Sequence, residues 1–325
     1  MMSNRKSSHR QTCLVTGGAG FIGSHLARRL IELGWQVVIL DNLSTGLLTN
    51  VPEGALFYRC DIAQREHLFR LRIPGPVTCI FHLAAQSSGE RSFDNPLHDI
   101  DTNYRATYHL LELCSRLRCR RFIYTSSMSV YGDVPRTHSP VTEDYPCHPV
   151  SYYGLHKLSS ERLTQIYSRQ AGIRATTFRL FSVYGPGQNM ANMKQGIVSI
   201  YWTYLRQNRP VLVKGSLSRY RDLVYISDVV DLLASAPCQE TLFDGVFNVG
   251  TGRRTTVRML LKKLLEIEGK QRFWRWVRVQ GHTPGDILGC FADISRVRQA
   301  TNWTPRVSLD SGLRHMKQWI DTQPV

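Results

Sequence analysis

Three side chains near the middle of the chain have the types and spacing needed to move a proton and a hydride. The stretch TSSMSVYG (125–132) contains Ser127, and YGLHK begins at Tyr153 and ends at Lys157. Tyr153 and Lys157 lie four residues apart, so on a helix they share a face. A free tyrosine has a pKa near 10, and lowering it to about 7 requires roughly 4 kcal/mol of stabilisation of the phenolate. A lysine ammonium and a positively charged nicotinamide ring can supply it.

These groups would act together on a substrate hydroxyl. Tyr153 would take the hydroxyl proton while a hydride leaves the same carbon for NAD⁺, and Ser127 would hold the oxygen. The spacing YxxxK alone is common, but its pairing with an upstream serine and a glycine-rich turn is specific. The predicted catalytic residues are Ser127, Tyr153 and Lys157.

The glycine-rich turn predicts where a dinucleotide would bind. GGAGFIG (17–23) follows an apolar run and opens a helical pattern, and it fits both G-x-G-x-x-G and G-x-x-G-x-x-G. Glycines allow a tight turn and close approach of a pyrophosphate, and the helix N-terminus offers free N–H groups. Asp41 ends the next strand, 23 residues after Gly18. Its carboxylate would accept hydrogen bonds from the ribose hydroxyls and repel a 2′-phosphate, which favours NAD over NADP.

Other positions at the same sheet edge are expected to line the cofactor. Asp61 and Ile62 follow the third strand, where the adenine would lie, and HLAAQ (82–86) places small alanines after the fourth. His82 is interpreted as a structural residue at a strand end. The predicted cofactor-binding residues are Gly17, Gly20, Phe21, Ile22, Gly23, Asp41, Asn42, Ser44, Asp61, Ile62, Leu83, Ala84, Ala85, Gln86, Asn103, Tyr153 and Lys157.

The elements that must position these groups alternate between strand and helix patterns. Apolar, β-branched runs predict strands, and segments with helical spacing follow most of them. Such alternation predicts a parallel sheet covered by helices on both faces. The expected strands are 12–17, 36–40, 56–60, 78–84, 121–126 and 174–182, and the expected helices are 21–33, 63–71, 97–118 and 151–171.

The pattern loosens after about residue 184. A glycine- and proline-containing loop is followed by a helix expected at 196–207 and by a strand entering a helix at 221–236. We therefore expect two interleaved lobes. The NAD-binding domain would comprise 10–184, with 221–250 partly returning to it; the substrate-binding domain would comprise 185–220 and 251–322; and 1–9 would form a basic disordered leader.

Composition limits the class of protein. The chain has 325 residues, of which 42% are hydrophobic, and it contains no run of 18 apolar residues that could span a membrane. Eight scattered cysteines without a CxxC pair favour a reduced, cytoplasmic protein with no metal site. The net charge is +16, and residues 151–325 carry 25 basic and 12 acidic side chains. A phosphorylated substrate, nucleic acid or an anionic membrane surface could each use this excess.

The motifs occur in the order seen in a known family. TGGAGFIGSH, LDNLSTG, HLAAQ, TSSMSVYG, YYGLHK, RLFSVYG and RDLVYISD resemble the extended short-chain dehydrogenases/reductases, and most closely the NAD-dependent epimerase/dehydratase group that acts on nucleotide sugars. The resemblance covers about residues 10–320. It implies an α/β fold, with a Rossmann-type doubly wound parallel sheet and a smaller C-terminal α/β substrate-binding domain. It also implies a homodimer, joined by a four-helix bundle of helices near 97–118 and 151–171.

The residues after Ser127 narrow the reaction that the resemblance implies. Family members that eliminate water or decarboxylate carry Asp-Glu or Ser-Glu before VYG, whereas this chain has Met128 and Ser129. The pattern is similar to UDP-hexose 4-epimerases, in which the C4 hydride goes to NAD⁺, the 4-keto sugar turns, and the hydride returns to its other face. A 4,6-dehydratase or a 4-ketoreductase stays open, although Asp41 argues against an NADPH-dependent reductase. A nucleic-acid-binding protein on this fold is an alternative of another class, but it would leave the Ser–Tyr–Lys set unexplained.

The resemblance also implies substrate contacts in the later half. Arg221 matches an arginine that contacts the nucleotide diphosphate, and its alternative is a surface salt bridge to Asp222 or Asp228. Asp286, in TPGD, would bond a ribose hydroxyl. Thr283 stands where 4-epimerases often have a second arginine.

Two more positions bear on the sugar. Ser182 stands where asparagine is usual. Cys290 falls where 4-epimerases have either a bulky tyrosine or a small residue, and a small side chain there resembles the forms that accept 2-acetamido sugars. A UDP-N-acetylhexosamine is therefore expected as an alternative substrate to a UDP-hexose. The predicted substrate-binding residues are Ser127, Ser182, Arg221, Asp286 and Cys290.

The segment RFWRWVRV (272–279) alternates arginine with aromatic or aliphatic residues. This pattern predicts a strand with one buried and one solvated face. A second interpretation is peripheral contact with an anionic membrane surface.

Overall fold

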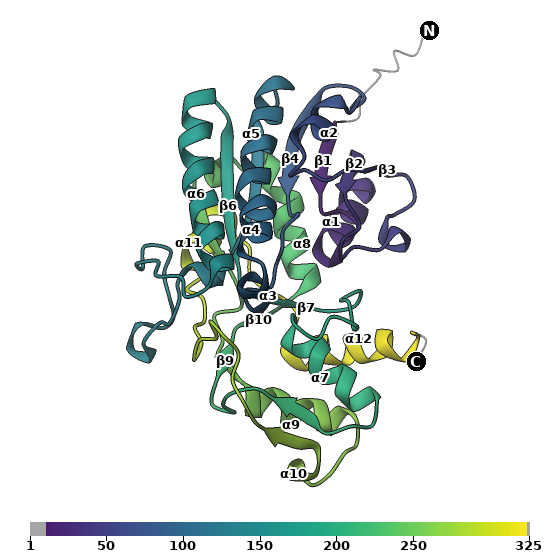
Figure 1. The fold of residues 1–325 in the computed structure, drawn as a ribbon, viewed down its shortest axis with the longest axis vertical. Helices are drawn as coiled ribbons and strands as arrows, with labels where there is room; N and C mark the ends of the chain where they lie inside the picture. The colour runs from purple at the N-terminus through teal and green to yellow at the C-terminus, as the bar shows by residue number, and fades with distance from the viewer. Residues whose placement is uncertain (1–10, 324–325) are drawn as a thin grey trace.

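The structure is a computed structural model that describes residues 11–323, so the expected leader at 1–9 lies outside the described residues. Its central feature is a seven-stranded sheet in the order β11-β6-β5-β4-β1-β2-β3, in which every neighbouring pair is parallel (Figure 1). The sheet has the doubly wound Rossmann topology that the alternating pattern predicts. Its strands are β1 (Thr12–Thr16), β2 (Gln36–Asp41), β3 (Leu56–Arg59), β4 (Val77–His82), β5 (Arg121–Ser127), β6 (Arg174–Leu180) and β11 (Val246–Val249).

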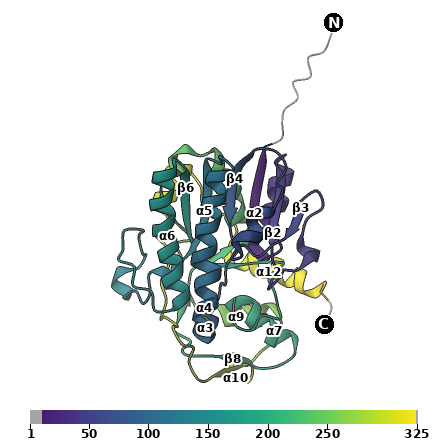
Figure 2. The ribbon, with the colours of Figure 1, turned by 45° about the horizontal axis from the view of Figure 1, so that its top comes forward.

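Two layers of helices cover the sheet, because its apolar strands bury side chains on both faces (Figures 1 and 2). Helices α1 (Phe21–Glu32), α8 (Ile226–Ser235) and α11 (Ser295–Thr301) share one apolar core with the sheet. Helices α2 (Arg65–Arg70), α5 (Ala106–Arg116) and α6 (Tyr152–Ala171) share a core on the opposite face.

The helix expected at 97–118 is less regular than the sequence pattern predicts. It begins as α4 (Pro96–Asp99), passes through a π-helical turn (Ile100–Arg105) and continues as α5. A separate short helix, α3 (Gly89–Asp94), precedes it. The remaining short turns of 3₁₀ helix are Leu48–Asn50, Met128–Val130, Arg136–His138, Ala236–Cys238 and Glu240–Leu242.

A smaller lobe has its own apolar core, to which Trp202 and Leu261 contribute fully buried side chains. Two short strand pairs lie in it, one parallel and one antiparallel. A third pair, β7 with β10, joins the lobe to the sheet domain. The elements are β7 (Ser182–Tyr184), α7 (Ile197–Arg206), β8 (Val211–Val213), β9 (Tyr220–Arg221), β10 (Leu223–Tyr225), β12 (Thr255–Thr256), α9 (Val257–Ile267), α10 (Phe273–Trp276), β13 (Val277–Val279) and α12 (Leu309–Asp321).

Two expected strands differ from those in the structure. The expected strand 272–279 is the short helix α10 followed by the three-residue strand β13, since Arg272 has a left-handed backbone that starts a new element. The expected strand 174–182 breaks at Phe181 into β6 and β7. Helix α11 packs on β11, although the expected division assigns it to the substrate lobe. Within residues 11–323, no helix has both the length and the apolar character needed to cross a membrane.

Candidate active site

A cavity of about 470 Å³ lies at the carboxyl ends of the parallel strands, between the sheet and the smaller lobe. Open α/β sheets hold their ligands at this edge. The cavity wall includes the predicted catalytic residues on one side and two arginines of the smaller lobe on the other. Its lining residues include Phe21, Ile22, Leu83, Ala85, Glu90, Ser127, Ser129, Tyr153, Lys157, Ser182, Lys194, Gln195, Lys214, Arg219, Arg221, Thr283 and Asp286.

The three predicted catalytic residues are brought together by β5 and the start of α6. Ser127 is the last residue of β5, and its hydroxyl donates to the Ser129 hydroxyl at 3.1 Å. Tyr153 and Lys157 lie in the first two turns of α6 and line the cavity. Helix α6 approaches the turn after β5 closely at Gly154, where a Cβ would lie 2.5 Å from the Ser129 carbonyl oxygen. A glycine at this position therefore lets Tyr153 reach the serine hydroxyls.

Burial of Tyr153 and Lys157 shifts the pKa values of both side chains. Burial raises the pKa of Tyr153 to about 12, although a hydrogen bond with Ser127 opposes the change. Burial also lowers the pKa of Lys157 to about 8, against the opposing charges of Asp99 and Glu161. The Lys157 ammonium donates to the Thr125 carbonyl at 2.9 Å. The chain by itself thus keeps Tyr153 protonated, and formation of the phenolate needs added positive charge nearby.

The glycine turn forms a cradle that fits a pyrophosphate. A Cβ on Gly23 would lie 2.1 Å from the Gly17 carbonyl oxygen, and a Cβ on Gly17 would lie 2.7 Å from the Ala84 nitrogen. Only glycines allow this close contact between β1, α1 and the loop after β4. Gly20 precedes α1, and no side chain caps the helix, so its first N–H groups stay available for an anion.

The residues expected to hold the ribose and adenine lie at the ends of β2 and β3. The Asp41 carboxylate is buried and accepts hydrogen bonds from the backbone nitrogens of Ala19 at 3.0 Å and Leu43 at 2.8 Å. It therefore ties the glycine turn to the end of β2. Asn42 accepts from the Ser44 nitrogen at 3.0 Å, and Asp61 accepts from the Ala63 nitrogen at 3.0 Å. Ile62 is buried in the core.

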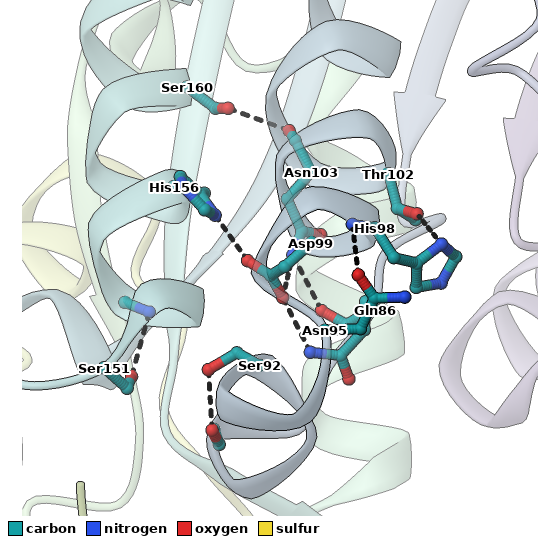
Figure 3. Close-up of polar contacts among 12 residues, drawn as sticks. Gln86, Ser92, Asn95, His98, Asp99, Thr102, Asn103, Ser151, His156 and Ser160 are labelled. Atoms are coloured by element: carbon teal, nitrogen blue, oxygen red, sulfur yellow. Dashed lines mark hydrogen bonds and ion pairs between the residues drawn. The ribbon is translucent and has the colours of Figure 1, made fainter.

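The expected nicotinamide-side residues divide into two groups. Phe21, Ile22, Leu83 and Ala85 line the cavity. Gln86 and Asn103 do not line it and belong instead to a buried polar cluster behind the wall (Figure 3). In that cluster the Asn103 amide donates to the Gln86 carbonyl at 2.9 Å. The Asn103 side-chain oxygen is buried without a hydrogen-bond partner.

His82 lies between two threonines. Its ring nitrogens are each 3.0 Å from a hydroxyl oxygen, of Thr16 and of Thr107, and the residue is buried. This placement is that of a structural strand-end histidine, as the sequence predicts.

The smaller lobe contributes a pair of arginines. Arg221 donates to the Asp286 carboxylate at 2.7 Å, and Arg219 forms a second ion pair with the same carboxylate. Burial lowers the pKa of Arg221 to about 10, and the charge of Arg219 lowers it further. Two guanidinium groups share one carboxylate, so the wall carries excess positive charge that suits a diphosphate.

Arg221 forms no salt bridge with Asp222 or Asp228, the two alternative partners that the sequence suggests. Asp222 accepts from the backbone nitrogens of Thr251 at 2.8 Å and Gly252 at 3.0 Å, and Asp228 accepts from the Val307 nitrogen at 3.1 Å. Sequence reasoning missed Arg219, although R-x-R at 219–221 signals two side chains on one face of an extended segment.

The other predicted substrate residues have mixed outcomes. Ser182 and Asp286 line the cavity, as does Thr283, but the Asp286 carboxylate is engaged by the two arginines. Cys290 is fully buried in an apolar cluster with Met128 and does not line the cavity. The volume argument for a 2-acetamido sugar requires contact at this position, so Cys290 gives that argument no support here, and a UDP-N-acetylhexosamine stays an alternative to a UDP-hexose.

The sequence analysis did not predict the residues that join the two lobes beside the cavity. Lys214 pairs with Glu90 of α3 at 3.0 Å, and Lys194 pairs with Asp94 of α3 at 2.7 Å. The Ser87 hydroxyl donates to the Gln195 side chain at 2.9 Å. Each contact joins residues at least 100 positions apart, which no local spacing reveals.

Comparison with known proteins agrees with this geometry. The model of the NAD dependent epimerase/dehydratase family matches residues 13–250. A protein of Methanocaldococcus jannaschii named putative UDP-glucose 4-epimerase is 31% identical over 94% of this chain and 97% of its own length. The UDP-glucose 4-epimerase of Mycolicibacterium smegmatis is 34% identical over 92% of this chain and 95% of its own.

Solved structures give the same result. The UDP-glucose 4-epimerase of Thermotoga maritima with UDP-glucose superposes with a TM-score of 0.90 at 35% identity, covering 96% of this chain and 99% of that one. The UDP-glucose 4-epimerase of Thermus thermophilus in complex with NAD gives a TM-score of 0.88 at 32% identity, with the same coverage. The glycine cradle, the Ser–Tyr–Lys wall and these likenesses agree, and the chain belongs to the NAD-dependent epimerase/dehydratase family.

Proposed function

We propose that this protein is an NAD-dependent nucleotide-sugar 4-epimerase whose substrate is a UDP-hexose. The observation that carries the proposal is one cavity with Ser127, Tyr153 and Lys157 on one wall and Arg219 and Arg221 on the other. A nucleotide sugar spanning the cavity would place its diphosphate against the guanidinium groups and its sugar against the hydroxyls.

Each group of the chain then has a role in the reaction. The glycine turn and Asp41 would hold NAD, which would supply hydride transfer from and back to the sugar carbon. Tyr153 takes the proton from the 4-hydroxyl and gives it back to the 4-keto oxygen, with Ser127 donating a hydrogen bond to that oxygen. Lys157 supplies positive charge that stabilises the Tyr153 phenolate. No proton is gained or lost over the full cycle.

The carboxylates of the cavity favour epimerisation over elimination. Among the described lining residues only Glu90 and Asp286 are acids, and both are held in ion pairs with basic side chains of the smaller lobe. Met128 and Ser129 supply no acid beside Ser127. A 4,6-dehydratase would lack the group that removes water, whereas oxidation and re-reduction at one carbon need none.

A panel experiment tests the proposal. Purified protein without added NAD would be incubated with UDP-, dTDP-, CDP- and GDP-hexoses, and the products identified by NMR. We expect interconversion of UDP-glucose and UDP-galactose. Release of a 4-keto-6-deoxy sugar, or turnover only with NADPH, would contradict it.

We also propose a homodimer joined through α5 and α6, which lie side by side (Figure 1). Large apolar side chains are exposed along these helices and the preceding turn; Leu97 is 74% and Ile166 68% exposed, and Tyr104, Tyr108 and Leu155 are also exposed. Burial of such a patch favours association. Light scattering of the wild-type protein should give twice the chain mass. The substitution Ile166→Asp should shift the measured mass toward that of the monomer. A monomer mass for both the wild type and the variant would contradict the dimer.

The last part of the proposal concerns location. A cytoplasmic enzyme of carbohydrate biosynthesis is proposed, with peripheral contact between the smaller lobe and an anionic membrane. Trp274 is 64% exposed, and the guanidinium of Arg258 lies 5.6 Å from its ring centre. Exposed apolar groups among arginines suit a lipid interface better than a phosphate backbone. The protein should sediment with vesicles containing phosphatidylserine at low salt, and the variant Trp274→Ser should not. A salt-sensitive gel-mobility shift of RNA or DNA, without sedimentation with vesicles, would favour nucleic acid as the partner.

A further inference from the structure

Helix α3 lies where the sheet domain meets the smaller lobe, and two lysines of that lobe bind it (Figures 1 and 2). Lys194, in the loop before α7, pairs with Asp94 at 2.7 Å. Lys214, which follows β8, pairs with Glu90 at 3.0 Å. Both ends of this six-residue helix are therefore held by the opposite lobe.

The segment that leads into α3 makes two further contacts with the loop that carries Lys194. The Ser87 hydroxyl donates to the Gln195 side-chain oxygen at 2.9 Å. The Ser88 hydroxyl donates to the Lys194 carbonyl oxygen at 2.9 Å. We call the two ion pairs and these two hydrogen bonds the α3 clasp, because together they join the two lobes.

The α3 clasp crosses the mouth of the cavity. Ser87, Glu90, Lys194 and Lys214 all line the cavity, yet the two lysine side chains are 41% and 45% exposed. A side chain that faces both the cavity and the solvent lies at the opening between them. Asp94 is 59% exposed and does not line the cavity, so it holds the clasp from the outside.

Helix α3 also touches the turn that carries Asp286. A Cβ on Gly285 would lie 2.7 Å from Cε2 of the Phe93 ring, so this turn packs directly on α3. The next residue, Asp286, is the carboxylate that pairs with Arg219 and Arg221. Separation of α3 from the smaller lobe would therefore loosen one side of the wall that faces the diphosphate.

The proposed reaction needs a mouth that stays closed between its two half-reactions. In the first, the sugar C4–H bond breaks and its hydride passes to NAD⁺, the hydroxyl proton passes to Tyr153, and the C4–O bond becomes a carbonyl. In the second, the same keto sugar takes back the hydride and the proton. A keto sugar that escaped between them would leave NADH in the site, and the enzyme could not start another cycle.

The contacts of the clasp suit a mouth that opens and closes. Exposed ion pairs are individually weak, and salt screens them, so substrate can enter and product can leave. We propose that the α3 clasp retains the nucleotide sugar and its 4-keto form until the hydride returns. Asp94 is a positioning residue in this device, because it acts through Lys194. The inference rests on the proposed function for the reaction that it protects, but nucleotide release can be measured without that reaction.

Asp94→Lys is the main test, because it breaks the outer ion pair from outside the cavity. The release rate of 5-fluoro-UDP, which carries no sugar to react, would be measured by ¹⁹F exchange NMR. We expect release to be about fivefold faster than from the wild type. Added positive charge alone would slow the release of an anion, so faster release identifies the broken pair as the cause.

A matched control is Asp231→Lys. Asp231 is 53% exposed and pairs with Arg29 at 3.2 Å, and neither residue lines the cavity. This variant makes the same charge change in a similar exposed ion pair, and it should leave the release rate unchanged. The double variant Asp94→Lys with Lys194→Glu recreates an opposite-charge pair and should reverse most of the increase.

Salt gives an independent check on the same pair. Raising the salt concentration from about 0.1 M to about 1 M shortens the range of charge interactions between exposed groups. The difference in release rate between the wild type and Asp94→Lys should therefore shrink. A difference that stayed constant would contradict an electrostatic clasp.

Turnover of UDP-glucose supplies a readout that a purely structural ion pair would not move. Early release of the keto sugar leaves NADH behind, so its near-ultraviolet absorbance should build up in Asp94→Lys while turnover declines. Wild type and Asp231→Lys should show no such build-up. Retention of full absorbance-silent turnover in Asp94→Lys would show that the clasp does not hold the intermediate.

The outcomes separate the clasp from the proposed function. Equal release rates in the wild type and Asp94→Lys, or a double variant that releases as fast as Asp94→Lys, would overturn the clasp even if sugars are epimerised. Charge-dependent release from a protein that converts no sugar would support the clasp while the proposed function fails. Failure of the wild type to bind 5-fluoro-UDP would overturn both. If Asp94→Lys does not fold, Asp94→Asn keeps the shape of the side chain and should release the nucleotide about twofold faster.

Discussion

The two ends of the cavity bind charge by different means. The cofactor end uses backbone: the glycine turn at 17–23 and the uncapped start of α1 offer N–H groups whose positions are fixed by close backbone contacts. The substrate end uses side chains: Arg219 and Arg221 converge on Asp286, 65 positions away from Arg221. The first site should therefore be sensitive to added volume, and the second to lost charge.

The largest effect should come from the wall that both ends share. Tyr153→Phe removes the group that carries the proton, and we expect kcat to fall by about 10²- to 10⁴-fold. Product formation measured by NMR would test this. The variant should keep its bound NAD and its thermal stability, so a loss of either would mean that the phenol has a structural role instead.

Added volume at the cofactor end should have the next largest effect. The Cβ of Gly23→Ala would lie 2.1 Å from the Gly17 oxygen, whereas that of Gly20→Ala would lie 3.2 Å from the same atom. We expect Gly23→Ala to cost about 3 kcal/mol or more in unfolding free energy and to lose copurifying NAD. Gly20→Ala should cost clearly less in a parallel denaturation series, and equal losses would break the steric account.

Loss of an arginine charge at the substrate end should raise KM for UDP-glucose. Arg221→Gln removes a charged hydrogen-bond donor, and we expect KM for UDP-glucose to rise about 10- to 100-fold with a smaller change in kcat. The exposed Arg253→Gln serves as a control of equal charge change. Similar KM values for both variants would show that the cavity arginines do not contact the diphosphate.

Raising the pH should affect the shared wall before the substrate end. Burial lowers the Lys157 pKa to about 8, so its ammonium is charged below that pH and neutral above it, whereas the Arg221 guanidinium, which is paired with Asp286, stays charged well above that pH. We expect kcat to decline by up to about tenfold per pH unit above pH 8 while KM for UDP-glucose changes little. A rise in KM before kcat falls would mean that the lysine charge does not control the chemical step.

The smallest effect should come from Cys290. Because this thiol is fully buried in an apolar cluster, Cys290→Ala should cost about 1 kcal/mol of unfolding free energy and leave the ratio of UDP-GlcNAc to UDP-glucose turnover unchanged. A changed ratio would restore Cys290 to the sugar site.

The same contrast explains what could be predicted from the sequence. Six of the seven sheet strands, α1, α6 and the glycine cradle are specified by local periodicity and by glycines needed at single positions, whereas β11 is not among the expected strands. The catalytic trio also follows from local spacing, since Tyr153 and Lys157 lie on one helix and Ser127 ends a strand. These features depend on neighbours a few residues away.

The remaining features depend on contacts between distant parts of the chain. Three of them form only when both lobes are folded together. They are the ion pair between Asp286 and Arg219, the ion pairs of Lys194 and Lys214 with α3, and the burial of Cys290. The error at 272–279 has another cause, because arginine–aromatic alternation fits a strand while the left-handed Arg272 starts a helix there instead. Propensity yields to tertiary context in such short elements.

The position of β11 limits how this enzyme can be divided or recombined. The chain leaves the sheet domain after β6, builds part of the smaller lobe, and then returns to add β11 at the sheet edge beside β6. A fragment ending near residue 184 would lack that strand and leave an aggregation-prone edge. Grafting the substrate lobe of a relative onto this scaffold would thus need several coordinated junctions, and specificity is more readily altered by point changes within the cavity.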